Sequence, residues 1–173
     1  ERATRMHQNL LDRPDLPADK REMATFELAP DFLRAGLLDR AEELFSKLAG
    51  TPFEHASLAH LISIYEQEKD WPRAIRATLR MEELSKTPYF REIAEYHCEI
   101  AQAALVRRDD ETVRREIADA LATHRGCVRA TLLAGDLARA DGDAAEAIAQ
   151  WQRIETQNPA FLSLAAERVG AAR

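Results

Sequence analysis

The sequence predicts an all-α protein, a right-handed superhelical solenoid made of antiparallel helix pairs. Alanine, leucine, glutamate and arginine dominate the 173 residues, whereas glycine occurs only six times. These side chains lose little rotamer freedom in a helix, so the composition favours helical structure. A helix–turn–helix pattern also recurs along the chain. Because a helix pair cannot bury its apolar stripe alone, each pair is expected to stack on the next one.

The clearest copy of this pattern runs from Gly135 to Trp151. It predicts a helix, a tight turn at Asp141 and Gly142, and a second helix that starts after Asp143. The Asp143 carboxylate can accept the free amide hydrogens of that helix start, and Gly142 can adopt the backbone conformation of the turn.

The spacing of the copies identifies the repeat. A small residue marks the second helix of each copy: Ala3, Ala41, Ala74, Val113 and Ala147. The successive intervals are 38, 33, 39 and 34 residues. Two of them match the tetratricopeptide period of about 34 residues, and the other two indicate linkers that are longer by about five residues.

These markers predict a single tetratricopeptide array over residues 1–173. In chain order we expect a half repeat at 1–12, full repeats at about 20–51, 53–86, 89–125 and 127–158, and a half repeat at 160–173. Prolines in the two longer linkers stop one helix and permit the next to start. Both half repeats would expose an apolar face, and the chain lacks an initiator methionine. We therefore expect it to be part of a longer protein.

Within each repeat, small residues are expected where two helices cross, and larger residues where the layer must be filled. The small residues are Ala29, Ala101 and Gly135 in first helices and Ala41, Ala74 and Ala147 in second helices. The expected core residues are Phe32, Phe45, Tyr65, Ile117 and Trp151. Pro30 is an exception, because it removes a hydrogen bond within a first helix at a cost of about 3 kcal/mol. It predicts a kink or an early helix start.

Charge and apolar content exclude several functions for this segment. The formal net charge is −6, and basic residues alternate with acidic ones, as where Arg107 and Arg108 run into Asp109. A nucleic-acid binder would need an unneutralised basic stripe. No stretch approaches the roughly 18 apolar residues of a membrane span. We expect a soluble segment without direct membrane contact.

The two cysteines, Cys98 and Cys127, show no C-x-x-C pair, so a disulfide is not expected. Both are interpreted as small buried apolar residues in a reducing compartment.

Catalytic signatures are missing from the sequence. It contains no phosphate-binding glycine loop and no H-E-x-x-H zinc pair, and its five histidines are scattered over different repeats. We therefore expect no catalytic residue, no metal ligand and no cofactor in this segment. An enzyme of helical-toroid or solenoid type stays open as an alternative, which a converging acid–base constellation in a pocket would support.

In tetratricopeptide arrays the first helices line an inner groove where extended or helical peptides dock. The corresponding candidate groove residues are Phe26, Leu33, Arg34, Ser63, Glu66, Gln67, Gln102, Arg129, Leu132, Asp136 and Arg139. The same residues could equally be ordinary solvated surface. The Lys/Asn/Arg clamp of chaperone-binding arrays is missing, which disfavours a receptor for chaperone C-termini.

Three segments resemble the lipopolysaccharide assembly protein B (LapB, earlier YciM) family of Gram-negative bacteria. They are AGLLDRAEELF at 35–45, IYEQEKDWPRAI at 64–75 and IAEYHCEIA at 93–101. The last two are more particular than a generic repeat consensus, and the resemblance covers nearly the whole chain.

The resemblance implies a parent protein anchored in the inner membrane by an N-terminal helix, with the array on the cytoplasmic side. It also implies a C-terminal rubredoxin-like zinc or iron module, for which this chain carries no ligand residues. In that family the array would serve as a scaffold that promotes proteolysis of the deacetylase LpxC by the protease FtsH, and a homodimer is possible. A generic interaction module in another bacterial assembly or secretion pathway remains the alternative.

Overall fold

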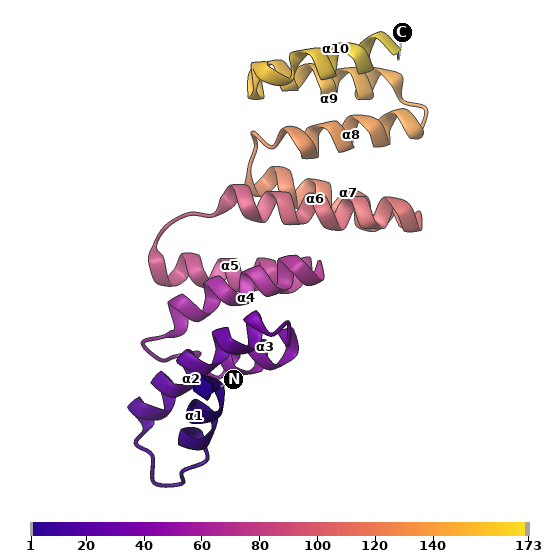
Figure 1. Cartoon of the computed structure of the whole chain (residues 1–173). Coiled ribbons are helices and arrows are strands. Elements are labelled where there is room, and N and C mark those ends of the chain that lie inside the picture. Colours follow the sequence, from indigo (N-terminus) through magenta and orange to yellow (C-terminus); the bar gives the residue numbers. More distant parts are fainter. Residues whose placement is uncertain (1, 172–173) are drawn as a thin grey trace. The chain divides into compact units, whose positions relative to one another are not determined.

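The computed structural model describes residues 2–171, with side chains from residue 5 onward. The described residues form ten α-helices and one short 3₁₀-helix, without any strand (Figure 1). The all-α prediction is therefore confirmed. Residues 1, 172 and 173, which belong to the two expected half repeats, lie outside the described residues. Contacts divide the chain into two compact units, Glu1–Pro88 and Tyr89–Arg173.

In the first unit each helix packs against the next along the chain. The helices are α1 (Arg2–Leu11), α2 (Ala18–Arg34), α3 (Leu38–Ser46), α4 (Glu54–Glu68) and α5 (Trp71–Ser85). The expected small residues Ala41 and Ala74 are fully buried, and so is the expected core residue Phe45. These residues let α2 and α3, and then α4 and α5, approach closely as helix pairs.

In the second unit α6 pairs with α7 and α8 pairs with α9, while α8 also contacts α6. The helices are α6 (Phe90–Arg107), α7 (Asp110–Thr123), α8 (Val128–Ala140), α9 (Ala144–Gln157), η1 (Pro159–Phe161) and α10 (Leu162–Ala171). Helix α10 packs on α9 (Figure 1). The contact between α6 and α8 brings together the first helices of two successive repeats, the elements expected to line a groove.

Aspartates cap three of the second helices. Asp70, Asp109 and Asp143 each accept a hydrogen bond from the backbone N–H three residues ahead, at 3.0, 3.2 and 2.9 Å. These bonds satisfy amide groups that have no partner within the helix. Gly142 has φ +85°, a left-handed conformation that glycine adopts without steric strain. The predicted turn and cap at 142–143 are confirmed.

Gly135 shows why a small residue is needed where α8 crosses α9. A Cβ atom at this position would lie 2.2 Å from the indole nitrogen of Trp151, whose side chain is fully buried. The indole therefore rests directly against the backbone of α8. The expectation of a close crossing at Gly135, with Trp151 filling the layer, is confirmed.

Pro30 lies inside α2, which continues as helix for four residues beyond it. The proline removes the N–H that would bond the carbonyl of Phe26. The helix neither starts nor ends at the proline, so the fold accommodates this residue within the repeat.

Among the described residues, none of the helices combines the length and the apolar character that crossing a bilayer requires.

Candidate partner-binding surface

Phe26, a predicted groove residue on α2, lies in an aromatic cluster. Its ring stacks on Phe53 at 5.0 Å and meets Phe45 edge-on at 6.3 Å between centroids. The imidazole of His60 in turn stacks on Phe45 at 4.6 Å. The Phe26 ring thus contributes to packing among α2, α3 and the start of α4. Its substitution would disturb the fold as well as any groove.

The other candidates of the first unit lie along α2 and α4. Leu33 is half-buried, whereas Arg34, Ser63, Glu66 and Gln67 are exposed. Arg34 binds Asp31 at 2.6 Å within α2, and Gln67 donates to Ser63 at 3.4 Å within α4. These bonds stay inside single helices and do not join α2 to α4.

In the second unit the structure brings Gln102 and Arg129 together. The Arg129 guanidinium contacts Glu99 at 2.7 Å and Glu95 at 3.2 Å, and it donates to the Gln102 side-chain oxygen. Positions 95, 99 and 102 lie on one face of α6, because residues three or four apart are neighbours on a helix surface. Arg129 comes from the first turn of α8. One cation thereby joins the first helices of two successive repeats.

The charge of Arg129 is stabilised by these acceptors. Burial opposes the charged form, but the hydrogen bonds that Arg129 donates to Glu99 and Glu95 outweigh it and raise the pKa of the guanidinium. The Arg129 side chain is 29% exposed. Its network is therefore accessible from solvent, and a polar partner can exchange hydrogen bonds with it.

A cavity of about 560 Å³ opens beside this network. Residues from the start of α6, the loop before α8, the first turns of α8, the end of α9 and η1 line it. They include Arg91, Glu95, His124, Cys127, Leu132, Gln157 and Phe161. Leu132 is the predicted groove residue among them. The side-chain oxygen of Gln157, another residue of the lining, is buried without a hydrogen-bond partner.

The two remaining candidates make contacts farther along α8. Asp136 accepts from Arg168 of α10 at 3.1 Å. The guanidinium of Arg139 lies 5.8 Å from the centroid of the Trp151 ring. Glu99 and Arg168 were not predicted as groove residues. The spacing of Glu95, Glu99 and Gln102 was the one signal in the sequence that could have identified Glu99.

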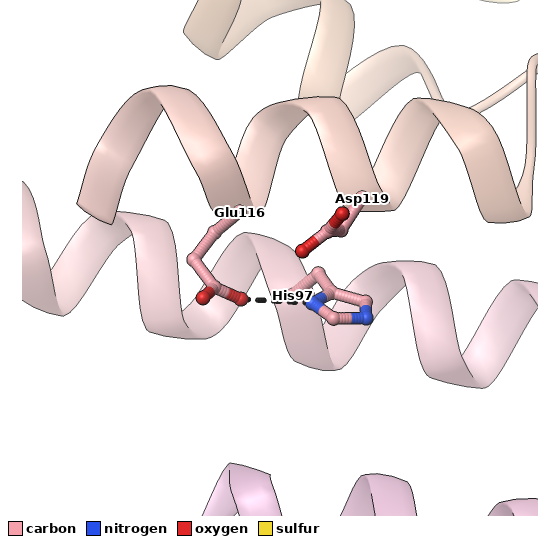
Figure 2. Close-up of side chains that lie close together, drawn as sticks. All are labelled: His97, Glu116 and Asp119. Carbon is pink, nitrogen blue, oxygen red and sulfur yellow. Dashed lines mark hydrogen bonds and ion pairs between the residues drawn. The ribbon is translucent and has the colours of Figure 1, made fainter. Parts of the chain in front are cut away.

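A histidine and two carboxylates lie close together between α6 and α7 (Figure 2). One possible ligand atom each from His97, Glu116 and Asp119 falls within 4.8 Å of the others. His97 Nδ1 is 2.8 Å from one Glu116 oxygen, and the Arg115 guanidinium lies 3.0 Å from the other. Such groups can ligate a divalent cation. Here the Arg115 guanidinium also pairs with the buried Glu116 carboxylate, so Glu116 has both Arg115 and His97 as partners.

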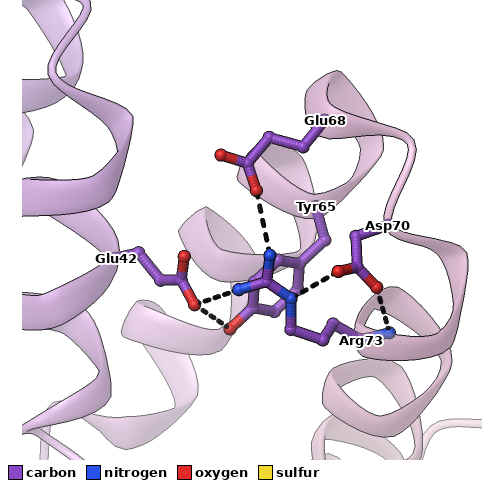
Figure 3. Close-up of polar contacts among 5 residues, drawn as sticks. All are labelled: Glu42, Tyr65, Glu68, Asp70 and Arg73. Carbon is purple, nitrogen blue, oxygen red and sulfur yellow. Dashed lines mark hydrogen bonds and ion pairs between the residues drawn. The ribbon is translucent and has the colours of Figure 1, made fainter.

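Arg73 organises a second polar cluster, in the first unit (Figure 3). It binds Asp70 at 2.6 Å and Glu68 at 3.3 Å, and it also contacts Glu42 of α3. The guanidinium lies 4.6 Å from the centroid of the Tyr65 ring, and the Tyr65 hydroxyl donates to Glu42 at 3.2 Å. Hydrogen bonds to Asp70 and then to Glu42 raise the Arg73 pKa. The cluster joins α3, α4 and α5 and has a structural role.

The sequence is similar to known lipopolysaccharide assembly proteins, although no protein-family model matches it. It is 30% identical over 164 residues to lipopolysaccharide assembly protein B of Escherichia coli K12, covering 94% of this chain and 42% of that protein. It is 32% identical over 162 residues to the protein of the same name from Haemophilus influenzae KW20, covering 93% and 41%. The chain thus spans about two fifths of these relatives.

The fold is similar to that of a solved structure. A crystal structure of MamA superposes with a TM-score of 0.50 at 18% identity, covering 87% of this chain and 80% of that one. At this identity the similarity concerns the fold alone. The resemblance predicted from the three sequence segments is confirmed. The chain therefore has a tetratricopeptide-repeat fold, and its sequence is similar, over nearly its whole length, to lipopolysaccharide assembly protein B.

Proposed function

We propose that this chain is the partner-docking array of a LapB-like adaptor that regulates lipopolysaccharide synthesis. In this proposal the array holds the deacetylase LpxC for proteolysis by FtsH on the cytoplasmic side of the inner membrane. The observation that supports it most is the similarity to lipopolysaccharide assembly protein B over 94% of the chain. The tetratricopeptide fold implies that the partners are proteins.

The docking surface that we propose is the groove of the second unit, defined as Glu95, Glu99, Gln102, Arg129 and Leu132 together with the adjoining cavity. Arg129 is the cation among these five residues, and its partial exposure lets a polar partner compete for its hydrogen bonds. Leu132 supplies apolar surface in the cavity lining. Apolar surface that carries a few fixed polar groups is typical of peptide and ligand sites.

The proposal assigns no chemical step and no cofactor to the chain itself. A zinc or iron site would belong to a rubredoxin-like module elsewhere in the parent protein. A homodimer is compatible with the proposal, because tetratricopeptide arrays can bind a second copy as well as another protein.

The test uses the full-length parent protein in a Gram-negative host from which the endogenous gene is deleted. LpxC half-life is measured after translation is stopped, with wild-type protein, Leu132→Asp and the control Glu155→Lys. Glu155 is an exposed residue of α9 outside the proposed surface.

Wild type and Glu155→Lys should shorten the LpxC half-life in an FtsH-dependent manner, whereas Leu132→Asp should lose most of this effect. An LpxC half-life that is the same with and without the wild-type protein would contradict the adaptor role. Full activity of a stably folded Leu132→Asp variant would contradict the proposed surface and leave the role intact.

A further inference from the structure

The two cysteines of the chain lie in contact, although 29 residues separate them in the sequence. Cys98 comes from the middle of α6, and Cys127 is the residue immediately before α8. Their sulfur atoms are 3.8 Å apart, and both thiols are free. The sequence predicted two separate buried residues. Burial is confirmed, but the close pairing was not foreseen.

We propose that Cys98 and Cys127 form an oxidisable dithiol, which hydrogen peroxide converts into an intrachain disulfide linking α6 to the start of α8. This inference does not depend on the proposed function. It assigns an oxidation site next to the groove of the second unit.

The environment of Cys127 favours its thiolate. Its sulfur accepts hydrogen bonds from the Cys98 thiol and from the backbone N–H groups of Ala130 and Arg129, at the positive end of α8. The bond from Cys98 is the largest influence, and burial opposes it. Together they lower the pKa of Cys127 to about 7. The thiolate is the nucleophilic form of cysteine.

Other charged groups face the pair from the surrounding elements. The Glu95 carboxylate of α6 lies 3.8 Å from the Cys127 sulfur and disfavours the thiolate. Arg129 of α8 is positively charged, unlike Glu95, and it forms an ion pair with Glu99. Arg91 and His124 line the same cavity. The pairing and burial raise the pKa of Cys98, which therefore keeps its proton until the second step.

Access to the two sulfurs differs. Cys127 lines the 560 Å³ cavity, which is large enough to admit hydrogen peroxide. Cys98 is fully buried and does not line that cavity. Peroxide should therefore reach Cys127 first, and Cys98 should react only with the oxidised Cys127.

The reaction balances with one peroxide. The Cys127 thiolate attacks a peroxide oxygen, the O–O bond breaks, and the departing hydroxide takes a proton to become water. The resulting sulfenic acid is attacked by the Cys98 sulfur, and the displaced hydroxide takes the Cys98 proton to form a second water. Two thiols are oxidised and one peroxide is reduced. The sulfurs must approach to about 2.05 Å, and Cys127 can move because it sits where a loop meets α8.

The experiment treats the chain with hydrogen peroxide and reads the products by intact mass and peptide mapping. Wild-type protein should lose about 2 Da, form no disulfide between chains, yield a Cys98–Cys127 cross-linked peptide and recover both thiols with dithiothreitol. Peptide mapping is needed because peroxide can also oxidise the exposed Met6, which changes the intact mass without involving the cysteines.

The two single variants separate the roles of the cysteines. In Cys98→Ser, peroxide should leave a sulfenic acid at Cys127, about 16 Da heavier, that dimedone traps. In Cys127→Ser, Cys98 should oxidise at least about tenfold more slowly than Cys127 does in Cys98→Ser, because Cys98 is fully buried and does not line the cavity. Circular dichroism checks that each variant is folded.

Several results would overturn the inference. They are oxidation of Cys127 to sulfinic acid without a cross-linked peptide, disulfides only between chains, and equal oxidation rates of Cys98 and Cys127 in the single variants. Retention of both thiols in folded wild type, under conditions that oxidise the unfolded chain, would also overturn it.

Discussion

The two units share one repeat pattern but differ in the size of the side chains on their first helices. We relate this difference to the candidate groove, which we place in the second unit. In the first unit a phenylalanine at a groove position, Phe26, packs against Phe45 and Phe53. In the second unit Cys98 of α6 contacts Cys127 at the start of α8, and the Arg129 network joins the same two helices. The large Phe26 ring at a groove position thus packs against neighbouring helices and remains half-buried. In the second unit the smaller residues Cys98 and Cys127 lie beside an accessible polar network and a cavity.

The largest loss of stability is expected at Gly135, where the second unit requires a residue without a side chain. Gly135→Ala would place a Cβ 2.2 Å from the Trp151 indole nitrogen, which the buried ring cannot avoid without moving α8 or α9. We expect the free energy of unfolding to fall by about 3 kcal/mol. Urea denaturation followed by tryptophan fluorescence measures it.

Gly170→Ala is the matched control for this prediction, because nothing lies within 4 Å of its added Cβ. It should leave the stability nearly unchanged. Equal midpoints for the two variants would show that the α8–α9 crossing tolerates a larger residue, and the importance of small residues in the second unit would then be overstated.

The next prediction concerns the reactivity of Cys127. Its alkylation by iodoacetamide should rise with pH and be half-maximal near pH 7, because the lowered pKa makes the thiolate available there. Cys98→Ala removes the thiol that donates to it, so the midpoint should move towards the ordinary value of 9.0. Rates are followed by mass spectrometry of the Cys127 peptide. A wild-type midpoint at the ordinary value would contradict the geometry of the pair.

In the first unit the Arg73 cluster should matter more than an ordinary surface arginine. Arg73→Met removes contacts to Glu42, Asp70 and Tyr65, and we expect a loss of about 1–2 kcal/mol, with allowance for the exposed third of the side chain. Thermal unfolding by circular dichroism reports the change. Arg76→Met, an exposed arginine of the same helix, is the control. A similar loss in both would remove the special role of the cluster.

The smallest expected effect compares helix caps between the units. Asp143 of the second unit caps α9, and Asp143→Ala should cost about 1 kcal/mol. Asp70 of the first unit caps α5 and also binds Arg73, so Asp70→Ala should cost more. Denaturant titrations of both variants decide the order. A larger loss from Asp143→Ala would reverse the comparison.

Local features of this fold could be predicted from the sequence because they depend on neighbouring residues. The cap at Asp143, the turn at Gly142 and the crossing of Gly135 with Trp151 all lie within one repeat. Periodicity defines which face of a helix is apolar. For that reason the buried positions Ala41 and Ala74 were also predicted correctly.

Contacts between repeats were harder to predict, because they depend on the relative register of helices that are distant in sequence. The position of Phe26 depends on Phe53, which follows an irregular linker whose path periodicity does not define. The pairing of Cys98 with Cys127 requires the offset between α6 and α8. Gln102 and Arg129 were both predicted as groove residues, but their direct contact, with Glu99 beside it, emerged only from the structure.

The central claim is that partners dock on the second unit, and a paired affinity measurement tests it most directly. The affinity of the parent protein for LpxC is measured for Leu132→Asp in the second unit and for Gln67→Asp in the first. Both positions were predicted groove residues, and both variants add one negative charge. We predict at least about tenfold weaker binding, equivalent to 1.4 kcal/mol, for Leu132→Asp and unchanged binding for Gln67→Asp. Weakened binding for Gln67→Asp alone, or for neither variant, would contradict the account.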